Sequence, residues 1–223
     1  MIPLGDENPT RIMPIVTWAL VVANIAIFLW EILLNPGVLE RMILVYGFVP
    51  DVVLHERAYY MFLTSMFLHG GVLHLAGNML YLHIFGDNVE DLCGHVPYIV
   101  FYLICGFAGS SLHLLSDLGS TVPSIGASGA ISGLLGAYIY LFPNVRIRTA
   151  VTFGILVRLI RLPAYLLIGF WFLYQVMLGL LAAETSVAYW AHVGGFVAGL
   201  GLARALARRR EEHPLFRVHY AVS

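Results

Sequence analysis

Long stretches without charged residues recur along this chain and limit what it can fold into. The first, Ile12–Trp30, contains no Asp, Glu, Lys or Arg, and about 20 apolar residues are enough to cross a bilayer as a helix. Overall, 60% of the residues are hydrophobic and 11% are charged, whereas a soluble domain averages about half and about a quarter. These values exclude a soluble globule and a disordered chain. They predict an all-α, polytopic membrane protein.

Six apolar spans are predicted in one membrane domain over 12–207, between an N-terminal tail (1–11) and a C-terminal tail (208–223). The spans are Ile12–Trp30, a helix that begins at Val72, Pro97–Ser116, a shorter span within Leu118–Val145, Leu162–Ala183 and Thr185–Ala203. The segment Ala58–His69 is too short to cross, and its aromatic residues favour the membrane interface. Asp6 and Glu7 argue against a signal peptide before the first span.

Arginine supplies every basic residue of this lysine-free chain, and its distribution predicts the orientation of the spans. With six spans, both termini lie on one side of the membrane. All of the 12 arginines except Arg41 and Arg57 fall on that side. The positive-inside rule therefore places both termini in the cytoplasm. A lysine-free chain with short tails favours the plasma membrane of a bacterium.

Charge and cysteine content exclude several other kinds of site. The formal net charge is −1, so the chain has no basic field for nucleic acid. Cys93 and Cys105 lack the spacing of metal ligands, and no HExxH motif occurs. We predict no metal and no cofactor, and the pattern favours no particular oligomeric state.

Four polar residues stand out within the apolar spans, where polar groups are costly and their positions are therefore informative. They are His74, Asn78, Ser128 and His192. Each lies near the start of the second, fourth or sixth span, and these three spans run in the same direction. With a helical rise of about 1.5 Å per residue, all four lie roughly 5–10 Å below the outer boundary. The spacing predicts a cluster of imidazole, amide and hydroxyl groups at one depth.

Small residues beside two of these groups predict close contact between two spans. Gly129 adjoins Ser128, and Gly195 and Gly199 follow His192. Glycine faces of this kind let helices approach closely in membranes. Ser128 and His192 would then form a hydrogen bond, in which the imidazole can remove the hydroxyl proton and later return it to a leaving amine.

Acyl transfer also requires hydrogen-bond donors for the developing oxyanion. The side chains of Asn78 and His74 can supply them. The backbone N–H of Ser128 is a further candidate because it lies at a helix N-terminus, where the dipole favours negative charge.

Three motifs that contain these residues resemble, in the same order, those of the rhomboid family of intramembrane serine proteases. They are His69–Asn78 (HGGVLHLAGN), Gly126–Gly129 (GASG) and Ala191–Gly199 (AHVGGFVAG). The resemblance covers roughly residues 12–207 and implies a six-helix bundle with a Ser–His dyad that lacks a carboxylate. It also implies an endopeptidase whose partners are the lipid bilayer and the transmembrane segments of substrate proteins.

Two positions depart from the family pattern. Tyr60-Met61 occupies the place where the family often has a Trp-Arg pair in the first outer loop. Ser132 occupies the place where an aromatic residue often stacks on the catalytic imidazole, which leaves open how His192 is oriented. The residues predicted to support the site are His69, Ser132, Gly129, Gly195 and Gly199.

Two other functions fit parts of the pattern. A catalytically inactive relative would bind membrane proteins without cutting them, and the departures at Ser132 and Tyr60-Met61 leave room for it. A six-helix transporter would use the same histidines and asparagine as a polar pathway. That function calls for polar groups toward both faces, and the inner halves of the spans hold little beyond Tyr138, Tyr140 and Gln175.

Overall fold

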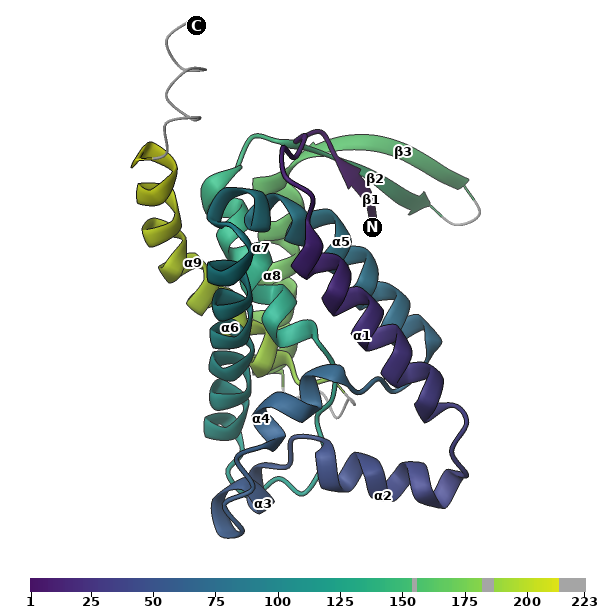
Figure 1. Ribbon diagram of the computed structural model, residues 1–223. Coiled ribbons are helices and arrows are strands. Elements are labelled where there is room, and N and C mark those ends of the chain that lie inside the picture. Colours follow the sequence, from purple (N-terminus) through teal and green to yellow (C-terminus); the bar gives the residue numbers. More distant parts are fainter. Residues whose placement is uncertain (154–155, 182–186, 213–223) are drawn as a thin grey trace, which may run out of the picture.

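The computed structural model describes residues 1–153, 156–181 and 187–212, and most of them are helical (Figure 1). The bundle helices are α1 (Ile15–Glu31), α5 (Val72–Cys93), α6 (His95–Ser116), α7 (Ser128–Leu141), α8 (Ala164–Leu180) and α9 (Tyr189–Glu212). The connection between α1 and α5 holds α2 (Pro36–Tyr46), α3 (Pro50–His55), α4 (Met61–Thr64) and the 3-10 helix η1 (Ser65–Phe67). The strands are β1 (Ile2–Asp6), β2 (Arg146–Phe153) and β3 (Leu156–Pro163).

Each predicted span overlaps one bundle helix, but the helices differ in length and polarity. Within the described part of the chain, α6 alone is both long and apolar enough to cross a membrane by these two criteria. Helices α1, α7 and α8 are apolar but shorter. Helices α5 and α9 carry charged residues in their C-terminal halves, among them Glu90 and Arg204. Six membrane crossings therefore stay a prediction.

Helix α7 is the most deeply buried element and packs against α9, α6 and α5. Every residue from Ala130 to Tyr138 is buried. With 14 residues α7 rises about 21 Å, whereas the 22 residues of α6 rise about 33 Å. A helix this short begins inside the bundle, so Ser128 at its N-terminus lies among the neighbouring helices.

Glycines allow the backbones of α7 and α9 to touch. A Cβ atom added at Gly195 would collide with the carbonyl oxygen of Gly129, and one at Gly199 with that of Gly133. A Cβ at Gly109 in α6 would lie 2.6 Å from the carbonyl oxygen of Ala191. These contacts bring the first turns of α7 and α9 together.

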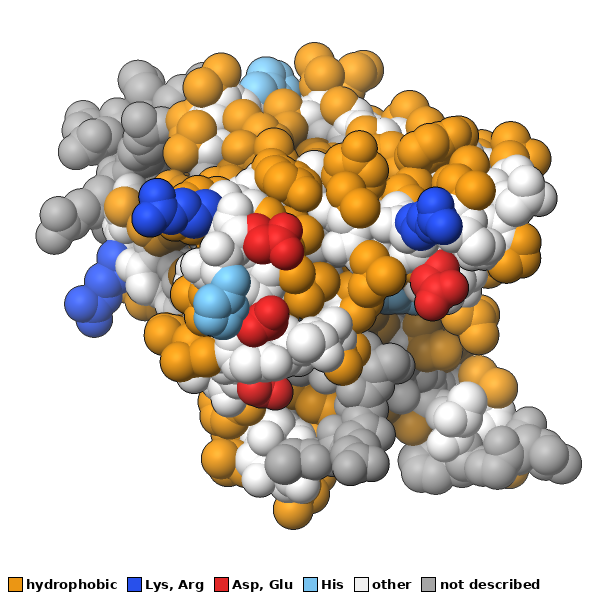
Figure 2. Space-filling view, turned by 90° about the horizontal axis from the view of Figure 1, so that it is seen from below, with side chains coloured by type: hydrophobic (Ala, Val, Ile, Leu, Met, Phe, Trp, Pro, Cys, Tyr) orange, Lys and Arg blue, Asp and Glu red, His pale blue; other side chains and the backbone are white. Residues whose placement is uncertain are grey.

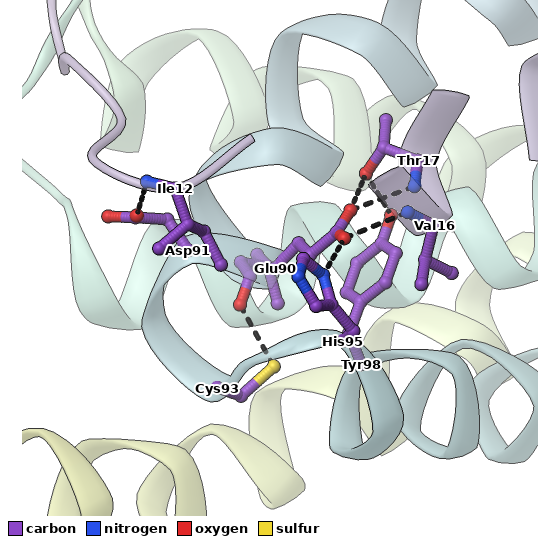
Figure 3. Close-up of polar contacts among 9 residues, drawn as sticks. Ile12, Val16, Thr17, Glu90, Asp91, Cys93, His95 and Tyr98 are labelled. Carbon is purple, nitrogen blue, oxygen red and sulfur yellow. Dashed lines mark hydrogen bonds and ion pairs between the residues drawn. The ribbon is translucent and has the colours of Figure 1, made fainter. Parts of the chain in front are cut away.

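A buried carboxylate joins three helices at the end of the bundle where α5 ends and α1 and α6 begin (Figure 3). Glu90 of α5 accepts hydrogen bonds from the backbone N–H groups of Val16 (2.9 Å) and Thr17 (2.8 Å) in the first turn of α1. The ring of His95, the first residue of α6, donates to Glu90 through Nδ1 at 2.6 Å. Unpaired N–H groups and the helix dipole favour a negative charge at this position. Glu90 thereby holds α1 and α6 against α5.

The prediction of an all-α chain is wrong at two segments. The expected N-terminal tail, 1–11, contains β1, and the arginine-rich loop after α7 forms the hairpin β2–β3. Together they make an antiparallel sheet in the order β1-β2-β3. Ile147 and Thr149 are buried while Arg146 and Arg148 are exposed, the alternation of a half-buried strand. In the sequence, the arginines also satisfy the positive-inside rule, and that signal conceals the alternation.

The N-terminal segment is tied to the bundle by buried polar contacts. Asp6 accepts hydrogen bonds from Nδ2 of Asn88 (2.9 Å) and from the hydroxyl of Tyr138. Burial raises the pKa of the Asp6 carboxyl, and the hydrogen bond from Tyr138 opposes that shift. The backbone N–H of Ile12 donates to Asp91 at 2.8 Å. These contacts position β1 beside β2.

Two predicted boundaries near the C-terminus can be compared with the structure only in part. Helix α9 continues past the expected domain end at residue 207 and reaches Glu212. Residues 213–223 of the predicted tail lie outside the described residues, as do 182–186, where the fifth and sixth predicted spans meet.

The connection between α1 and α5 has a small hydrophobic core of its own. Phe48, Val53 and Met61 are each 1% exposed and belong to one cluster. The segment Ala58–His69, predicted to lie in the membrane interface, contains α4 and η1. Tyr60-Met61 stands where the family often has a Trp-Arg pair. In this chain Met61 stabilises the connection by packing into its small hydrophobic core. Seen from this end, the surface is mostly hydrophobic with a few separated charged groups (Figure 2).

Candidate active site

The structure brings Ser128 and His192 together from two helices. Ser128 is the first residue of α7, and His192 lies in the first turn of α9. Oγ of Ser128 and Nε2 of His192 are 2.8 Å apart, the distance of a normal hydrogen bond. The hydroxyl and the imidazole thus have the contact that a nucleophile and its general base require.

The chain enters α7 through a turn that requires glycine. Gly126 has φ +124°, and a Cβ atom there would lie 2.8 Å from Nε2 of His74. The backbone N–H of Gly126 donates to the carbonyl oxygen of Ser65 at 2.8 Å. Upstream, Phe48 and Ser124 exchange two backbone hydrogen bonds, each 2.8 Å long. The α1–α5 connection thereby holds the segment that presents Ser128.

The second ring nitrogen of His192 is held by a residue that the sequence reasoning did not place in the site. Nδ1 of His192 and Oε1 of Gln175, in α8, are 2.8 Å apart, and Gln175 is buried. Because an amide oxygen only accepts, Nδ1 carries the proton and Nε2 is left with a lone pair. This is the tautomer that can take the proton of Ser128. Gln175 is the single carboxamide of its predicted span. Its contact with His192 places it at the level of the active site, so the prediction that it lies in the inner half of the span is wrong.

Aromatic rings also border the imidazole, but none comes from position 132. The hydroxyl of Ser132 donates to the carbonyl oxygen of Ser128 at 2.6 Å. The indole of Trp171 in α8 lies 6.0 Å from the His192 ring, tilted by 36°, and the ring of Tyr189 lies 6.4 Å away, nearly perpendicular. The orientation of His192 thus depends on α8 and on its own helix.

The predicted oxyanion residues lie beside the serine on α5. His74 and Asn78 line the same cavity as Ser128 and His192. Nδ1 of His74 accepts a long hydrogen bond, 3.4 Å, from the backbone N–H of Gly70. As the first residue of α7, Ser128 has a backbone N–H without an intrahelical partner. Three candidate donors therefore lie at the cavity that contains the nucleophile.

His69 lies behind the cavity and contacts Asn78. The Asn78 amide donates through Nδ2 to Nε2 of His69 at 3.0 Å, and Nδ1 of His69 donates to the carbonyl oxygen of Phe67 at 3.3 Å. The backbone N–H of His69 lies 3.3 Å from both carboxylate oxygens of the buried Glu31. His69 thus orients the Asn78 amide and does not line the cavity.

The cavity itself has a volume of about 680 Å³, a size typical of ligand-binding pockets. Besides the residues above, Tyr81, Trp171 and Ser65 contribute to its lining. Within the described residues, no group of three or more His, Cys, Asp or Glu side chains could hold a metal ion. The chemistry available in the cavity is that of a hydroxyl, an imidazole and hydrogen-bond donors.

Comparison with known proteins identifies relatives of this chain. A model of the Rhomboid domain matches residues 56–209. The chain is 34% identical over 183 residues to Rhomboid protease GluP of Bacillus subtilis (strain 168), covering 80% of this chain and 32% of that protein. It is 35% identical over 150 residues to RHOMBOID-like protein 1 of Arabidopsis thaliana, covering 67% of this chain and 35% of that protein.

A third relative comes from yeast, and none of the three is matched along most of its length. Rhomboid protein 1, mitochondrial, of Saccharomyces cerevisiae (strain ATCC 204508 / S288c) is 33% identical over 135 residues, covering 58% of this chain and 37% of that protein. The chain thus spans about a third of the length of these relatives. Because the Rhomboid domain match extends over more than half of the chain and includes all three motifs, this protein belongs to the rhomboid family of integral membrane proteins.

Proposed function

We propose that this protein is an intramembrane serine endopeptidase that hydrolyses peptide bonds in or near transmembrane segments of other membrane proteins. The observation that carries the proposal is the 2.8 Å contact between Oγ of Ser128 and Nε2 of His192 at the wall of a cavity. The similarity to Rhomboid protease GluP, which extends over 80% of this chain, supports it.

In the proposed reaction, Oγ of Ser128 attacks the scissile carbonyl carbon while Nε2 of His192 takes the hydroxyl proton. The tetrahedral intermediate collapses when the imidazolium returns that proton to the leaving amine. Water then hydrolyses the acyl-enzyme with His192 again acting as the base. The carbonyl of an intact substrate helix is hydrogen-bonded within that helix, so the cavity must accept a locally unwound segment.

The negative oxygen of the intermediate is stabilised by donors that are already in position. The Asn78 amide, whose orientation is set by His69, and the His74 ring line the cavity together with Ser128, whose backbone N–H is the third donor. Donors held in place before the reaction stabilise developing charge without reorganisation.

We further propose that α1, α5, α6, α7, α8 and α9 each cross the membrane, with both termini in the cytoplasm of a bacterium. The support is the arginine distribution in the sequence. The sheet adjoins the C-terminal end of α7, whereas Ser128 is its first residue. In this orientation the active site lies toward the outer face.

Incubation of the purified, detergent-solubilised protein with single-span model substrates tests the function. Mass spectrometry of the products should reveal one hydrolysed bond in or near the apolar segment. Binding of these substrates without any product would support the inactive, client-binding alternative and contradict a protease.

Asn78→Ala should lower kcat about 10²–10³-fold, the usual cost of removing one oxyanion donor. The measurement is the initial cleavage rate at saturating substrate. Ser132→Ala is the matched control, because Ser132 lines the same cavity but donates to the Ser128 carbonyl. We expect that control to change the rate only a few-fold. Equal rates in the two variants would remove Asn78 from the oxyanion site.

Gln175→Met should lower kcat about 10–100-fold and leave KM nearly unchanged, because the imidazole loses the acceptor that selects its tautomer. Gln175→Glu keeps an acceptor oxygen at the same place and should restore most of the rate. Tyr174→Phe, at an exposed neighbour, is the control. If kcat falls by the same factor in the Met and Glu variants, Gln175 acts through packing and does not position His192.

A further inference from the structure

The hairpin β2–β3 extends from the end of the bundle opposite the candidate active site. It leaves the bundle after α7 and returns at the start of α8. Figure 1 shows the strands β2 and β3 running across the direction of the helices and extending past α5. Near the tip, Leu156, Val157 and Leu159 are 61%, 63% and 73% exposed. Part of the sheet therefore has no protein beneath it among the described residues.

The strand register shows which face of the sheet is directed at the bundle. Ile147 pairs with Leu162, and Ile147 is fully buried against the bundle. Paired residues of an antiparallel sheet lie on the same face, and this face recurs at every second position. Leu156, Arg158 and Ile160 therefore share the face of Ile147, whereas Val157 and Leu159 lie on the other face. Where the sheet extends beyond the edge of the bundle, that face is exposed to the medium around the helices.

The hairpin is also strongly basic. Residues 146–163 contain four arginines and no acidic residue. Arg161 forms an ion pair with Glu7 at 3.1 Å. Within the described part of the chain, no ion pair is found for Arg146 or Arg158. The exposed side chains of Leu156, Arg158 and Ile160 lie on one face. Such a face matches a membrane surface, which combines acyl chains with negatively charged headgroups.

We propose that the hairpin β2–β3 is a membrane-surface anchor that binds anionic phospholipids of the leaflet at this end of the bundle. Leu156 and Ile160 enter the boundary between headgroups and acyl chains, and Arg146 and Arg158 pair with lipid phosphates. Guanidinium groups suit this role because they bind phosphate oxygens in a bidentate manner. The proposal rests on the membrane location of the protein and is independent of its proteolytic activity.

The charge contribution is tested by native mass spectrometry of the full chain in detergent, titrated with phosphatidylglycerol or phosphatidylcholine. Each basic residue near an anionic surface contributes about fivefold in binding. Arg146→Gln with Arg158→Gln should therefore reduce the preference for phosphatidylglycerol about 25-fold. The double variant Arg41→Gln with Arg57→Gln removes the same charge at the other end and should keep the preference. Equal effects of the two double variants would overturn the proposal.

The apolar contribution is tested with adjacent labels in bilayers that contain phosphatidylglycerol. A fluorophore is attached to Leu156→Cys or to Val157→Cys, which lie on opposite faces of β3, and the native Cys93 and Cys105 are buried. Quenching by nitroxide-labelled lipid should be strong at position 156 and weak at position 157. Equal quenching at both positions, or none at either, would contradict insertion of this face.

Discussion

The Ser128→Ala protein is expected to fold and insert normally but to leave a transmembrane substrate uncut, with a rate at least about 10⁴-fold below that of the unaltered protein. The Ser128 hydroxyl pairs with His192, so its removal takes away the nucleophile and leaves the buried helix α7 intact. His192→Ala should have an effect of similar size because an unactivated hydroxyl is a weak nucleophile. The measurement is product formation from a model substrate in detergent.

A fluorophosphonate probe gives an independent reading of the same pair. It should label Ser128 in the unaltered protein and fail to label the His192→Ala protein. Ser132→Ala should still be labelled, since its hydroxyl contacts the Ser128 carbonyl and not the imidazole. Undiminished cleavage by either dyad variant would refute the proposed mechanism.

Gly195→Ala is expected to destabilise the protein strongly, by about 3 kcal/mol. The added methyl group would overlap the carbonyl oxygen of Gly129 in α7, and a helix backbone cannot move aside without separating the two helices. Because Ser128 and His192 lie on these helices, activity should fall together with stability. Thermal unfolding in detergent and the cleavage rate are the two measurements.

Gly201→Ala is the matched control for that prediction. Gly201 lies on the same helix, and a Cβ atom there would meet no described atom within 4 Å. Alanine favours helix over glycine by about 1 kcal/mol, so this variant should be as stable as the unaltered protein or slightly more stable. Equal unfolding temperatures for the two variants would show that close approach of α7 and α9 is not required.

The sequence was sufficient to assign the chain to the rhomboid family, and the reason is physical. Polar residues stand out in apolar spans because lipid offers them no partner, so Ser128, His192, His74 and Asn78 are conspicuous. The motifs that contain them are contiguous in the chain, and the rhomboid assignment on that basis is confirmed by the domain match. The Ser–His dyad and its activity stay proposals, supported by the geometry of the site.

Other features had no comparable signal. Gln175 contacts His192 because α8 packs in an orientation that directs its single carboxamide at α9. The hairpin β2–β3 is obscured because its arginines also satisfy the rule for cytoplasmic loops. The role of His69 in orienting Asn78 depends on the path of the α1–α5 connection, whose packing involves residues far apart in the chain.

The chain's own residue order was enough to establish a helical membrane protein of the rhomboid family, since hydropathy and motif spacing are properties of contiguous segments. Three other features were decided only by the tertiary structure. They are the close approach of α7 and α9, the acceptor for the Nδ1 proton of His192, and the part of the sheet that extends beyond the bundle. Each depends on how separate helices and strands are placed against one another, and that placement is decided by packing among distant residues.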